Sequence, residues 1–352
     1  MTTTTLTNTN PPNRIEDVAQ LEALLSEPSD AAVAALRQVD GDVMLLGVGG
    51  KMGPTLAKMV KRAADQAGTP RRIIGASRFS DADLPRQLEA DGIETIKCDL
   101  LNEDELAKLP DCPNIIYMAG MKFGSTGKEA LTWAMNTHLP ALVSKRFAQS
   151  RIVGFSTGNV YGLVPIAHGG SRETDPPNPD GEYAISCLGR ERIFEHFSRT
   201  NNTPMATIRL NYAVELRYGV LVDLAQQVYA DQPIDLSMGN MNVIWQADAN
   251  AMTIAALAHA DSPPFLLNVA GPEILSVRQI CQRFGELLNK NVQFIGEESP
   301  DALINNGQKG HRLFGYPRIG IDQMQQWIAD WLQRGGETLG KPTHFEVRDG
   351  KF

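Results

Sequence analysis

Apolar and polar positions along the chain alternate in two ways, and each way predicts a different element. Short apolar runs that end in glycine or polar residues are typical of buried parallel strands. Longer segments with apolar residues three and four apart predict amphipathic helices. Six apolar runs are predicted as strands: 42–50, 71–77, 93–99, 114–120, 151–157 and 205–210. Helices are predicted between most of them, at 51–68, 101–109, 128–149 and 182–199.

This alternation predicts an α/β fold, a doubly wound parallel sheet of the Rossmann type. We expect the sheet and its helices to occupy residues 41–212. Beyond residue 212 the pattern loosens, and we expect a smaller C-terminal substrate lobe over 213–352, with segments near 241–270 returning to the Rossmann domain. That region contains further predicted elements: helices within 219–234, 276–288 and 321–334, a strand-turn-helix at 242–260 and a strand at 265–271.

Residues 1–40 lie before this pattern and are predicted to form a tail followed by a helical extension. The first 14 residues are rich in Thr, Asn and Pro, a composition typical of disorder. Two amphipathic segments follow, 14–27 and 29–39, with Ser29 or Asp30 as the N-cap of the second. The sequence indicates no function for this extension.

Composition and charge exclude several classes of protein. The formal net charge is −8, and no run of lysine or arginine interrupts it, so we expect no nucleic-acid partner. The chain begins without an apolar signal segment and has no stretch of 18 apolar residues, so we expect a cytoplasmic protein with no membrane span. Its 4 cysteines lie far apart, and no spacing of His, Cys, Asp and Glu predicts a metal site.

The strongest local signal is a glycine loop between the first strand and the first helix of the sheet. In LLGVGGKMGPTLA, Gly47, Gly50 and Gly53 stand at G-x-x-G-x-x-G spacing. The first glycine permits a tight turn, the second lets the backbone approach a pyrophosphate, and the third lets helix and strand pack closely. With Lys51 and Met52 between them, these residues predict a dinucleotide-binding site.

The end of the second strand indicates which dinucleotide is bound. An acidic residue there would favour NAD, but this chain has Ser77 and Arg78, with no acid before Asp81. Arg78 could pair with a 2′-phosphate while Ser77 donates to it, and Lys51 adds a second positive charge. We therefore expect NAD(P) binding with NADP favoured over NAD. The alternative is that Arg78 is an ordinary solvated residue.

From about Asp42 to Gln333 the chain resembles the extended short-chain dehydrogenase/reductase family, the NAD-dependent epimerases and dehydratases. The matching motifs occur in the family's order. They are the glycine loop, KCDL (97–100), YMAG (117–120), MNTHLP with Asn136, FSTGNVYG (155–162), the segment 173–186, TIRLNYA (207–213), WQADANA with Asp248, and LLNVAGPE.

The resemblance implies roles for particular residues. Asp99 and Leu100 would contact the adenine ring, and Ala119 and Gly120 would lie beside the cofactor. Thr157, with Ser156 beside it, and Tyr183 would be catalytic: their hydroxyls would hold the substrate oxygen while Tyr183, which also lies against the cofactor, moves the proton. The resemblance also implies a homodimer through the Tyr183 helix and its neighbour.

One residue departs from the family's Tyr-x-x-x-Lys motif: the lysine position holds Cys187. A free tyrosine has a pKa near 10, so a base that works at neutral pH needs about 4 kcal/mol of preferential phenolate stabilisation. The family's lysine supplies much of this, and a thiol does not. Arg190 lies on the same helical face but roughly 10 Å along the axis. It is expected either to compensate for the lysine or to be a helix-surface residue. Cys187 itself is expected to be a small buried side chain rather than a nucleophile.

Other positions limit the reactions that the sequence predicts. Dehydratases of the family carry Asp and Glu directly after the catalytic Thr, where this chain has Gly158 and Asn159, so elimination would lack its acid and base. His138 is expected to be structural. His168 is expected to be either a substrate contact or an exposed loop residue.

The sequence thus predicts an NAD(P)-dependent oxidoreductase or epimerase that acts on the hydroxyl or ketone of a sugar-like small molecule, including sugar nucleotides. The alternative is a catalytically silent NAD(P)-binding sensor, which would tolerate the loss of the lysine. Retention of Thr157 and Tyr183 favours the enzyme because a sensor needs neither.

Overall fold

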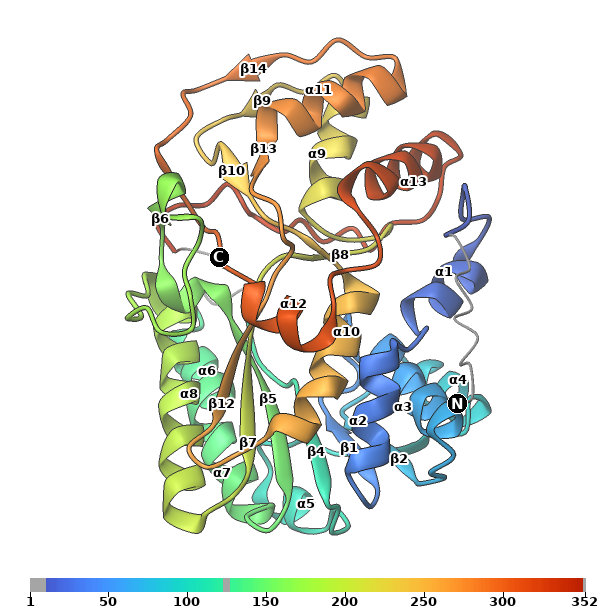
Figure 1. Ribbon diagram of the computed structural model, residues 1–352, viewed down its shortest axis with the longest axis vertical. Coiled ribbons are helices and arrows are strands. Elements are labelled where there is room, and N and C mark those ends of the chain that lie inside the picture. Colours follow the sequence, from blue (N-terminus) through green and yellow to red (C-terminus); the bar gives the residue numbers. More distant parts are fainter. Residues whose placement is uncertain (1–10, 123–126, 351–352) are drawn as a thin grey trace, which may run out of the picture.

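The computed structural model of the protein describes residues 11–122 and 127–350. The predicted disordered tail falls mainly on residues 1–10, which lie outside the described residues. The rest of the chain folds into a large α/β layer structure with a smaller lobe, which is at the top of the view in Figure 1.

The large part is built on a sheet of seven parallel strands in the order β12-β7-β5-β4-β1-β2-β3. All six strands predicted before residue 212 are present, and β12 pairs with β7 at one edge. The strand order reverses between β1 and β4, which is the switch point at which such sheets bind ligands. The strands are β1 Val43–Leu46, β2 Ile73–Ser77, β3 Glu94–Lys97, β4 Asn114–Tyr117, β5 Arg151–Thr157, β7 Met205–Leu210 and β12 Phe265–Val269.

Helices connect these strands in the pattern of a doubly wound Rossmann fold, as predicted. The predicted helix at 128–149 is interrupted by one turn of π-helix, Ala134–His138, which holds Asn136. Such turns occur frequently at functional sites. The helices are α2 Asp30–Gln38, α3 Gly53–Ala67, α4 Leu84–Ala90, α5 Glu103–Ala107, α6 Glu129–Trp133, α7 Leu139–Arg146, α8 Gly181–Asn201 and α10 Gln246–Ala255, with 3-10 turns at Gly158–Tyr161, Ile166–His168 and Ala256–His259.

The sheet is buried on both faces, so alternate residues of one strand enter two different hydrophobic cores. In β1, Val43 and Leu45 belong to the core that includes residues of α2, α3 and α10. Met44 and Leu46 belong to the other core, with residues of α5, α7 and α8. This two-sided burial explains why the strands appear in the sequence as continuous apolar runs.

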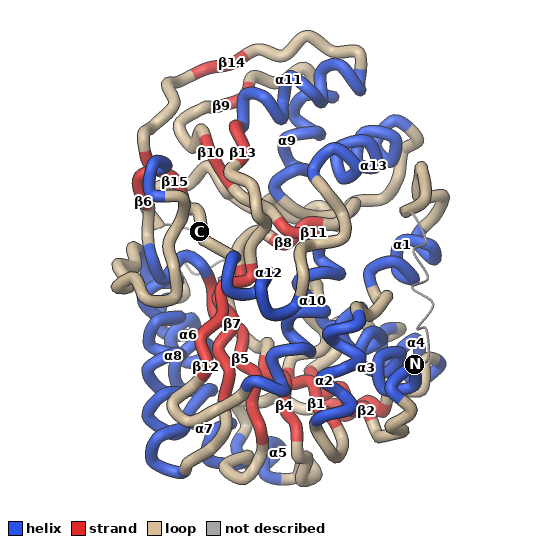
Figure 2. The backbone as a smooth tube through the Cα atoms, viewed as in Figure 1, coloured by secondary structure: helices blue, strands red, loops and turns tan. Residues whose placement is uncertain are grey.

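The smaller lobe consists of helices and short strand pairs, which Figure 2 shows above the main sheet. Short pairs also join distant segments: β8 with β11 and β6 with β15. The lobe and its connections comprise β6 Val164–Pro165, β8 Ala213–Val214, α9 Val220–Tyr229, β9 Ile234–Asp235, β10 Asn240–Met241, β11 Ile244–Trp245, β13 Leu275–Ser276, α11 Val277–Leu288, β14 Phe294–Ile295, β15 Asp301–Ala302, α12 Gln308–Phe314 and α13 Ile321–Gln333.

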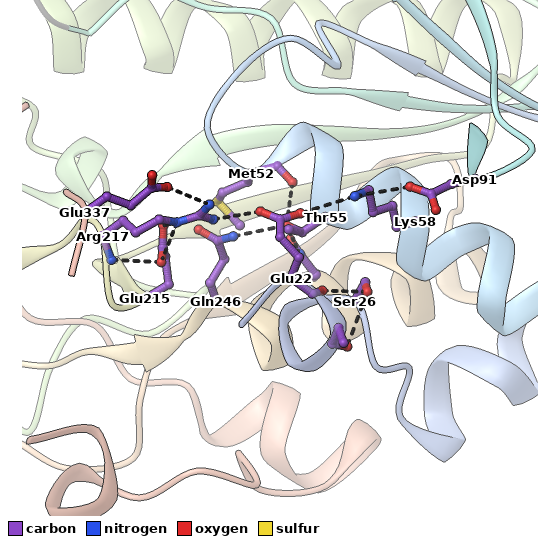
Figure 3. Close-up of polar contacts among 12 residues, drawn as sticks. Glu22, Ser26, Met52, Thr55, Lys58, Asp91, Glu215, Arg217, Gln246 and Glu337 are labelled. Carbon is purple, nitrogen blue, oxygen red and sulfur yellow. Dashed lines mark hydrogen bonds and ion pairs between the residues drawn. The ribbon is translucent and has the colours of Figure 1, made fainter. Parts of the chain in front are cut away.

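The N-terminal extension packs against the large layer as α1, Val18–Leu25, and α2. Ser29 caps α2 by accepting a hydrogen bond from the Ala32 amide. Glu22 on α1 joins two parts of the molecule, because it pairs with Lys58 on α3 at 3.4 Å and with Arg217 at 2.8 Å (Figure 3). The extension therefore connects the helix after the glycine loop to the segment that leads into the smaller lobe.

No helix within the described ranges is long and apolar enough to cross a membrane.

Candidate active site

The glycine loop turns sharply between β1 and α3, and two of its glycines leave no room for a side chain. Gly47 has a φ of +94°, and a Cβ there would lie 2.8 Å from the Ala119 amide nitrogen. A Cβ on Gly53 would lie 2.1 Å from the Val48 carbonyl oxygen. A Cβ on Gly50 would meet only the Gly47 carbonyl oxygen, at 3.4 Å, and Gly50 faces a cavity. The loop therefore fits a pyrophosphate that approaches the backbone at Gly50 and the start of α3.

The cavity has a volume of about 340 Å³ and lies at the carboxyl ends of the parallel strands. The glycine loop contributes Gly50, Lys51 and Met52 to its wall. Most of the remaining wall of the cavity comes from the ends of β4 and β5, the start of α8, the segment after β7 and the start of α9. These include Gly120, Lys122, Thr157, Asn159, Tyr183, Arg190, Tyr212, Tyr218 and Thr343.

The structure therefore brings the two predicted catalytic residues to one cavity with part of the predicted cofactor site. Ala119 follows β4 beside Gly47 but does not line the cavity. Ser77 also lies against the glycine loop, since a Cβ on Gly49 would be 2.7 Å from its Oγ. Arg78 follows it and is exposed. Asp99 and Leu100 follow β3 after Cys98, and Asp99 Oδ1 accepts a hydrogen bond from the Leu101 amide.

Thr157 and Tyr183 interact directly at the cavity wall. The Thr157 hydroxyl accepts from the Asn159 amide at 3.2 Å and donates to Asn159 Oδ1 at 3.3 Å. Burial raises the pKa of Tyr183, and Cys187 raises it further. A hydrogen bond with Thr157 and the charge of Arg190 act in the opposite direction. Tyr183 is thus a neutral phenol that needs further positive charge before it can act as a base near neutral pH.

Cys187 is buried and packs with Val160, Tyr161 and Tyr183. Burial raises the pKa of its thiol. A protonated thiol surrounded by apolar groups is a poor nucleophile, so the structure agrees with a small buried side chain at this position.

Arg190 is not a helix-surface residue, because only 5% of it is exposed. Nη1 donates to the Phe155 carbonyl at 2.7 Å, and Nη2 donates to Asn136 Oδ1, also at 2.7 Å. A Cβ on Gly120 would lie 2.5 Å from Nη2, so this glycine allows the guanidinium to reach the end of β4. The charge of Arg190 lowers the pKa of Tyr183, while its donors are committed to fixed acceptors.

Two lysines line the cavity: Lys51, which was predicted from the glycine loop, and Lys122, which was not predicted. Lys122 lies with its Nζ 5.9 Å from the Tyr183 ring centroid, and burial lowers its pKa to about 8. Lys51 Nζ lies 3.3 Å from the Tyr218 ring centroid, and burial, followed by the charges of Lys341 and Lys122, lowers its pKa to about 7. Lys51 was expected to add a positive charge near Arg78, and its ammonium lies over the Tyr218 ring in the cavity wall. Lys122 belongs to no motif, so only its tertiary position reveals it.

A buried ion pair stabilises the end of β5. Arg209 on β7 contacts the Glu191 carboxylate on α8 at 2.6 Å, and both side chains are almost fully buried. Ser156 Oγ donates to Glu191 Oε1 at 2.5 Å. Arg209 also donates to the Tyr161 hydroxyl. This network engages Ser156 and thereby fixes the strand end that carries Thr157.

Neither of the two residues after Thr157, Gly158 and Asn159, carries a carboxylate that could serve as the acid or base of a dehydratase. A Cβ on Gly158 would lie 2.4 Å from Asn305 Oδ1, so an aspartate would require Asn305 to move. His168 is exposed and does not line the cavity, and His138 belongs to the π-helix. Within residues 11–122 and 127–350, no three His, Cys, Asp or Glu side chains are placed to hold a metal ion.

The C-terminal tail closes one side of the cavity. The Thr343 amide and hydroxyl donate to Asp223 Oδ2 at 2.7 and 2.6 Å. Arg348 pairs with Asp301 at 2.5 Å. The tail also lines a second cavity of about 210 Å³, which shares Asn159 and Tyr212 with the first. The walls of the two cavities are therefore formed partly by residues of the tail.

Known structures share this architecture at low sequence identity. UDP-glucuronic acid 4-epimerase from Bacillus cereus, in complex with NAD, superposes with a TM-score of 0.67 and 16% identity, over 83% of this chain and 99% of that one. MoeE5 in complex with UDP-glucose and NAD gives 0.67 and 17%, over 84% and 99%. dTDP-glucose 4,6-dehydratase from Bacillus anthracis str. Ames, in complex with NAD, gives 0.68 and 15%, over 84% and 97%. These similarities show the fold. No curated protein matches the chain.

The sequence comparison with protein families matches the part of the chain that carries the glycine loop, Thr157 and Tyr183. Residues 43–215 match the model of the NAD dependent epimerase/dehydratase family. This segment, residues 43–215, therefore belongs to the NAD dependent epimerase/dehydratase family.

Proposed function

We propose that the protein is an NAD(P)-dependent oxidoreductase or epimerase that acts on a hydroxyl or ketone of a sugar-like substrate. The observation that carries this proposal is the meeting of Thr157 and Tyr183 at one cavity with Gly50 of the glycine loop. In this proposal, residues 41–212 hold the cofactor, and residues 213–352 form the substrate lobe.

The cofactor would be held by the glycine loop at its pyrophosphate and by Ser77 and Arg78 at its adenosine ribose. Asp99 and Leu100 would lie at the adenine, and Ala119 and Gly120 beside the rest of the dinucleotide. Ser77 and the exposed, positively charged Arg78 favour NADP over NAD, because they match a 2′-phosphate. When bound, the nicotinamide accepts or supplies a hydride.

The residues of the chain handle the proton. The Thr157 hydroxyl, oriented by Asn159, and the Tyr183 hydroxyl would bind the substrate oxygen from two sides. Tyr183 takes the proton from a hydroxyl or returns it to a ketone. Because the two residues after Thr157, Gly158 and Asn159, carry no carboxylate, oxidoreduction or epimerisation is favoured over elimination.

Sugar nucleotides are the substrate class that we propose to test first. The Bacillus cereus epimerase and MoeE5, which share the fold, are described in complexes with UDP-glucuronic acid and with UDP-glucose. In this chain the cavity extends from Thr157 toward the lobe and adjoins the second cavity, which would accept a substrate longer than a single sugar ring.

The experiment is a binding titration followed by a turnover screen. The purified protein would be titrated with NADH and NADPH by fluorescence and then incubated with UDP-sugars, dTDP-sugars, free sugars and sugar acids. Reduced nicotinamide would be followed by absorbance and epimeric products by NMR. Turnover of a sugar-like substrate supports the proposal. Tight cofactor binding with no turnover of any of these classes would instead favour a silent dinucleotide sensor.

We also propose a homodimer through α8 and its neighbour α6. Their outer faces carry three large, exposed apolar residues: Leu131, Trp133 and Ile185. Sedimentation of the wild type and of Ile185→Glu tests this, because a glutamate in such an interface should yield monomers. A wild-type monomer at micromolar concentration would contradict it.

A further inference from the structure

Lys122 places an ammonium group near Tyr183, whose own helix has Cys187 at the lysine position of the Tyr-x-x-x-Lys motif. It follows β4, on a different element from Tyr183 and Cys187, which both lie on α8. Its Nζ is 5.9 Å from the Tyr183 ring centroid, within the range of cation–π attraction. The charge of Lys122 lowers the pKa of the Cys187 thiol, and Cys187 in turn raises the pKa of Lys122.

The backbone next to Lys122 is held firmly. Asn136 Oδ1 accepts from the Met121 amide at 2.8 Å, and Asn136 Nδ2 donates to the Met121 carbonyl, also at 2.8 Å. The same Nδ2 donates to Ser186 Oγ at 3.0 Å. One buried amide thus fixes the residue before Lys122 against the residue before Cys187. This contact sets the position of the β4 loop relative to α8.

We propose that Lys122 is the electrostatic partner of Tyr183, and that it supplies from the β4 loop the positive charge that the lysine of the family motif would supply from α8. The proposal rests on the proposed function. In the reaction, the proton moves only between the Tyr183 oxygen and the substrate oxygen, and Lys122 remains protonated throughout. Its charge stabilises the phenolate whenever Tyr183 has lost its proton.

The surroundings of Lys122 explain why a thiol is tolerated at 187. Burial lowers the pKa of Lys122 to about 8, while Cys187 on α8, Asp223 on α9 and Glu346 in the tail raise it. Two other cations line the same cavity: Arg190, whose charge lowers the pKa of Cys187, and Lys51, whose pKa Lys122 lowers. A lysine at 187 would add a further ammonium to this partly buried group and raise the cost of charging Lys122. A neutral thiol avoids that repulsion.

The proposal makes residues 122 and 187 interchangeable as the source of charge. The variants are Lys122→Met, Lys122→Arg, Cys187→Lys and the double variant Lys122→Met/Cys187→Lys, with Lys128→Met as the control. Lys128 is exposed at the start of α6 and faces neither Tyr183 nor the cavity. Thermal unfolding and NADH binding identify variants that have lost the fold or the cofactor site.

With a substrate found by the screen, Lys122→Met should lower kcat by about 100-fold, the contribution expected of a positioned proton-transfer group. Lys122→Arg should retain most activity, Cys187→Lys alone should bring no gain, and the double variant should recover at least about a tenth of wild-type kcat. Lys128→Met should match the wild type. If folded Lys122→Met keeps its activity and pH profile, or if Lys128→Met loses as much, the proposal is wrong.

A second readout does not depend on turnover. Competitive acylation with mass spectrometry, repeated across pH in the protein without substrate, reports the pKa of each lysine. Lys122 should titrate near pH 8 in the wild type and lower in Cys187→Lys, whereas Lys128 should be unchanged by that substitution. An unperturbed Lys122, or one that Cys187→Lys leaves unchanged, overturns the proposal. If no substrate is turned over, the proposed function fails while this titration still decides whether Lys122 senses residue 187.

Discussion

The side chain of Asn136 binds the backbone of Met121 in both directions, accepting from its amide and donating to its carbonyl, each at 2.8 Å. The same side chain accepts from Arg190 and donates to Ser186. Asn136 is completely buried, so water cannot replace these partners. It connects the β4 loop, the π-helix and α8 at a single point.

Replacement of Asn136 should therefore loosen the contacts that hold the β4 loop, the π-helix and α8 together. We expect Asn136→Ala to lower turnover by about tenfold or more, because the loop that carries Lys122 and the Arg190 guanidinium lose their common anchor. It should also lower the free energy of unfolding by about 1–3 kcal/mol, since buried polar groups are left unpaired. The measurements are steady-state kinetics and urea unfolding. A variant with wild-type kcat would show that the anchor does not position the catalytic groups.

Arg78 is predicted to determine cofactor choice. Arg78→Ala should weaken NADPH binding by about tenfold or more while leaving NADH binding nearly unchanged, because only the 2′-phosphate pairs with the guanidinium. Fluorescence titration with both cofactors measures this. Arg86→Ala is the matched control, since Arg86 is an exposed arginine paired with Asp83 on α4. Equal losses for both cofactors would remove the basis for an NADP preference.

The partly buried charge of Lys51 should lower the free energy of unfolding. Its pKa is lowered to about 7 in the folded protein from 10.5, mainly by burial. Below pH 7 the folded state carries the full penalty of a partly desolvated charge, and above 10.5 neither state is charged. Lys51→Met should therefore raise the unfolding temperature most below pH 7, and the gain should shrink as the pH rises toward 10.5. Calorimetry across pH tests this. A gain that is independent of pH would show that packing alone is responsible.

The Arg209–Glu191 pair is predicted to be essential to the fold beneath the site. Arg209→Met leaves the Glu191 carboxylate buried without its cation and should cost about 3–5 kcal/mol of stability. An exposed pair on the same helix gives the comparison: Arg199→Met, which breaks the contact with Glu195, should cost less than about 1 kcal/mol. Urea unfolding measures both. Similar losses in the two variants would contradict the importance assigned to the buried pair.

Local sequence patterns sufficed for the sheet and the glycine loop because their determinants lie within a few residues. Gly47 adopts a left-handed φ and Gly53 contacts Val48, and both requirements belong to one strand-turn-helix unit. Thr157 and Tyr183 were found through the family resemblance, and the structure brings them to one cavity.

What the sequence could not predict depends on contacts between distant segments. Arg190 is too far along α8 to be judged from helical spacing, since its partners are Asn136 and the Phe155 carbonyl on other elements. Lys122 has no motif, and its significance appears only when β4 and α8 are placed together. The tail lines the cavity through Thr343, a residue that no periodicity singled out.

The central claim is that Tyr183 moves a proton at a dinucleotide site, and one comparison tests it most directly. Wild type and Tyr183→Phe would be saturated with cofactor, mixed with each substrate of the panel and followed by nicotinamide absorbance and product NMR. The account predicts turnover by the wild type and a loss of about 100-fold or more in Tyr183→Phe, with unchanged cofactor affinity. Equal turnover by the two proteins would contradict it.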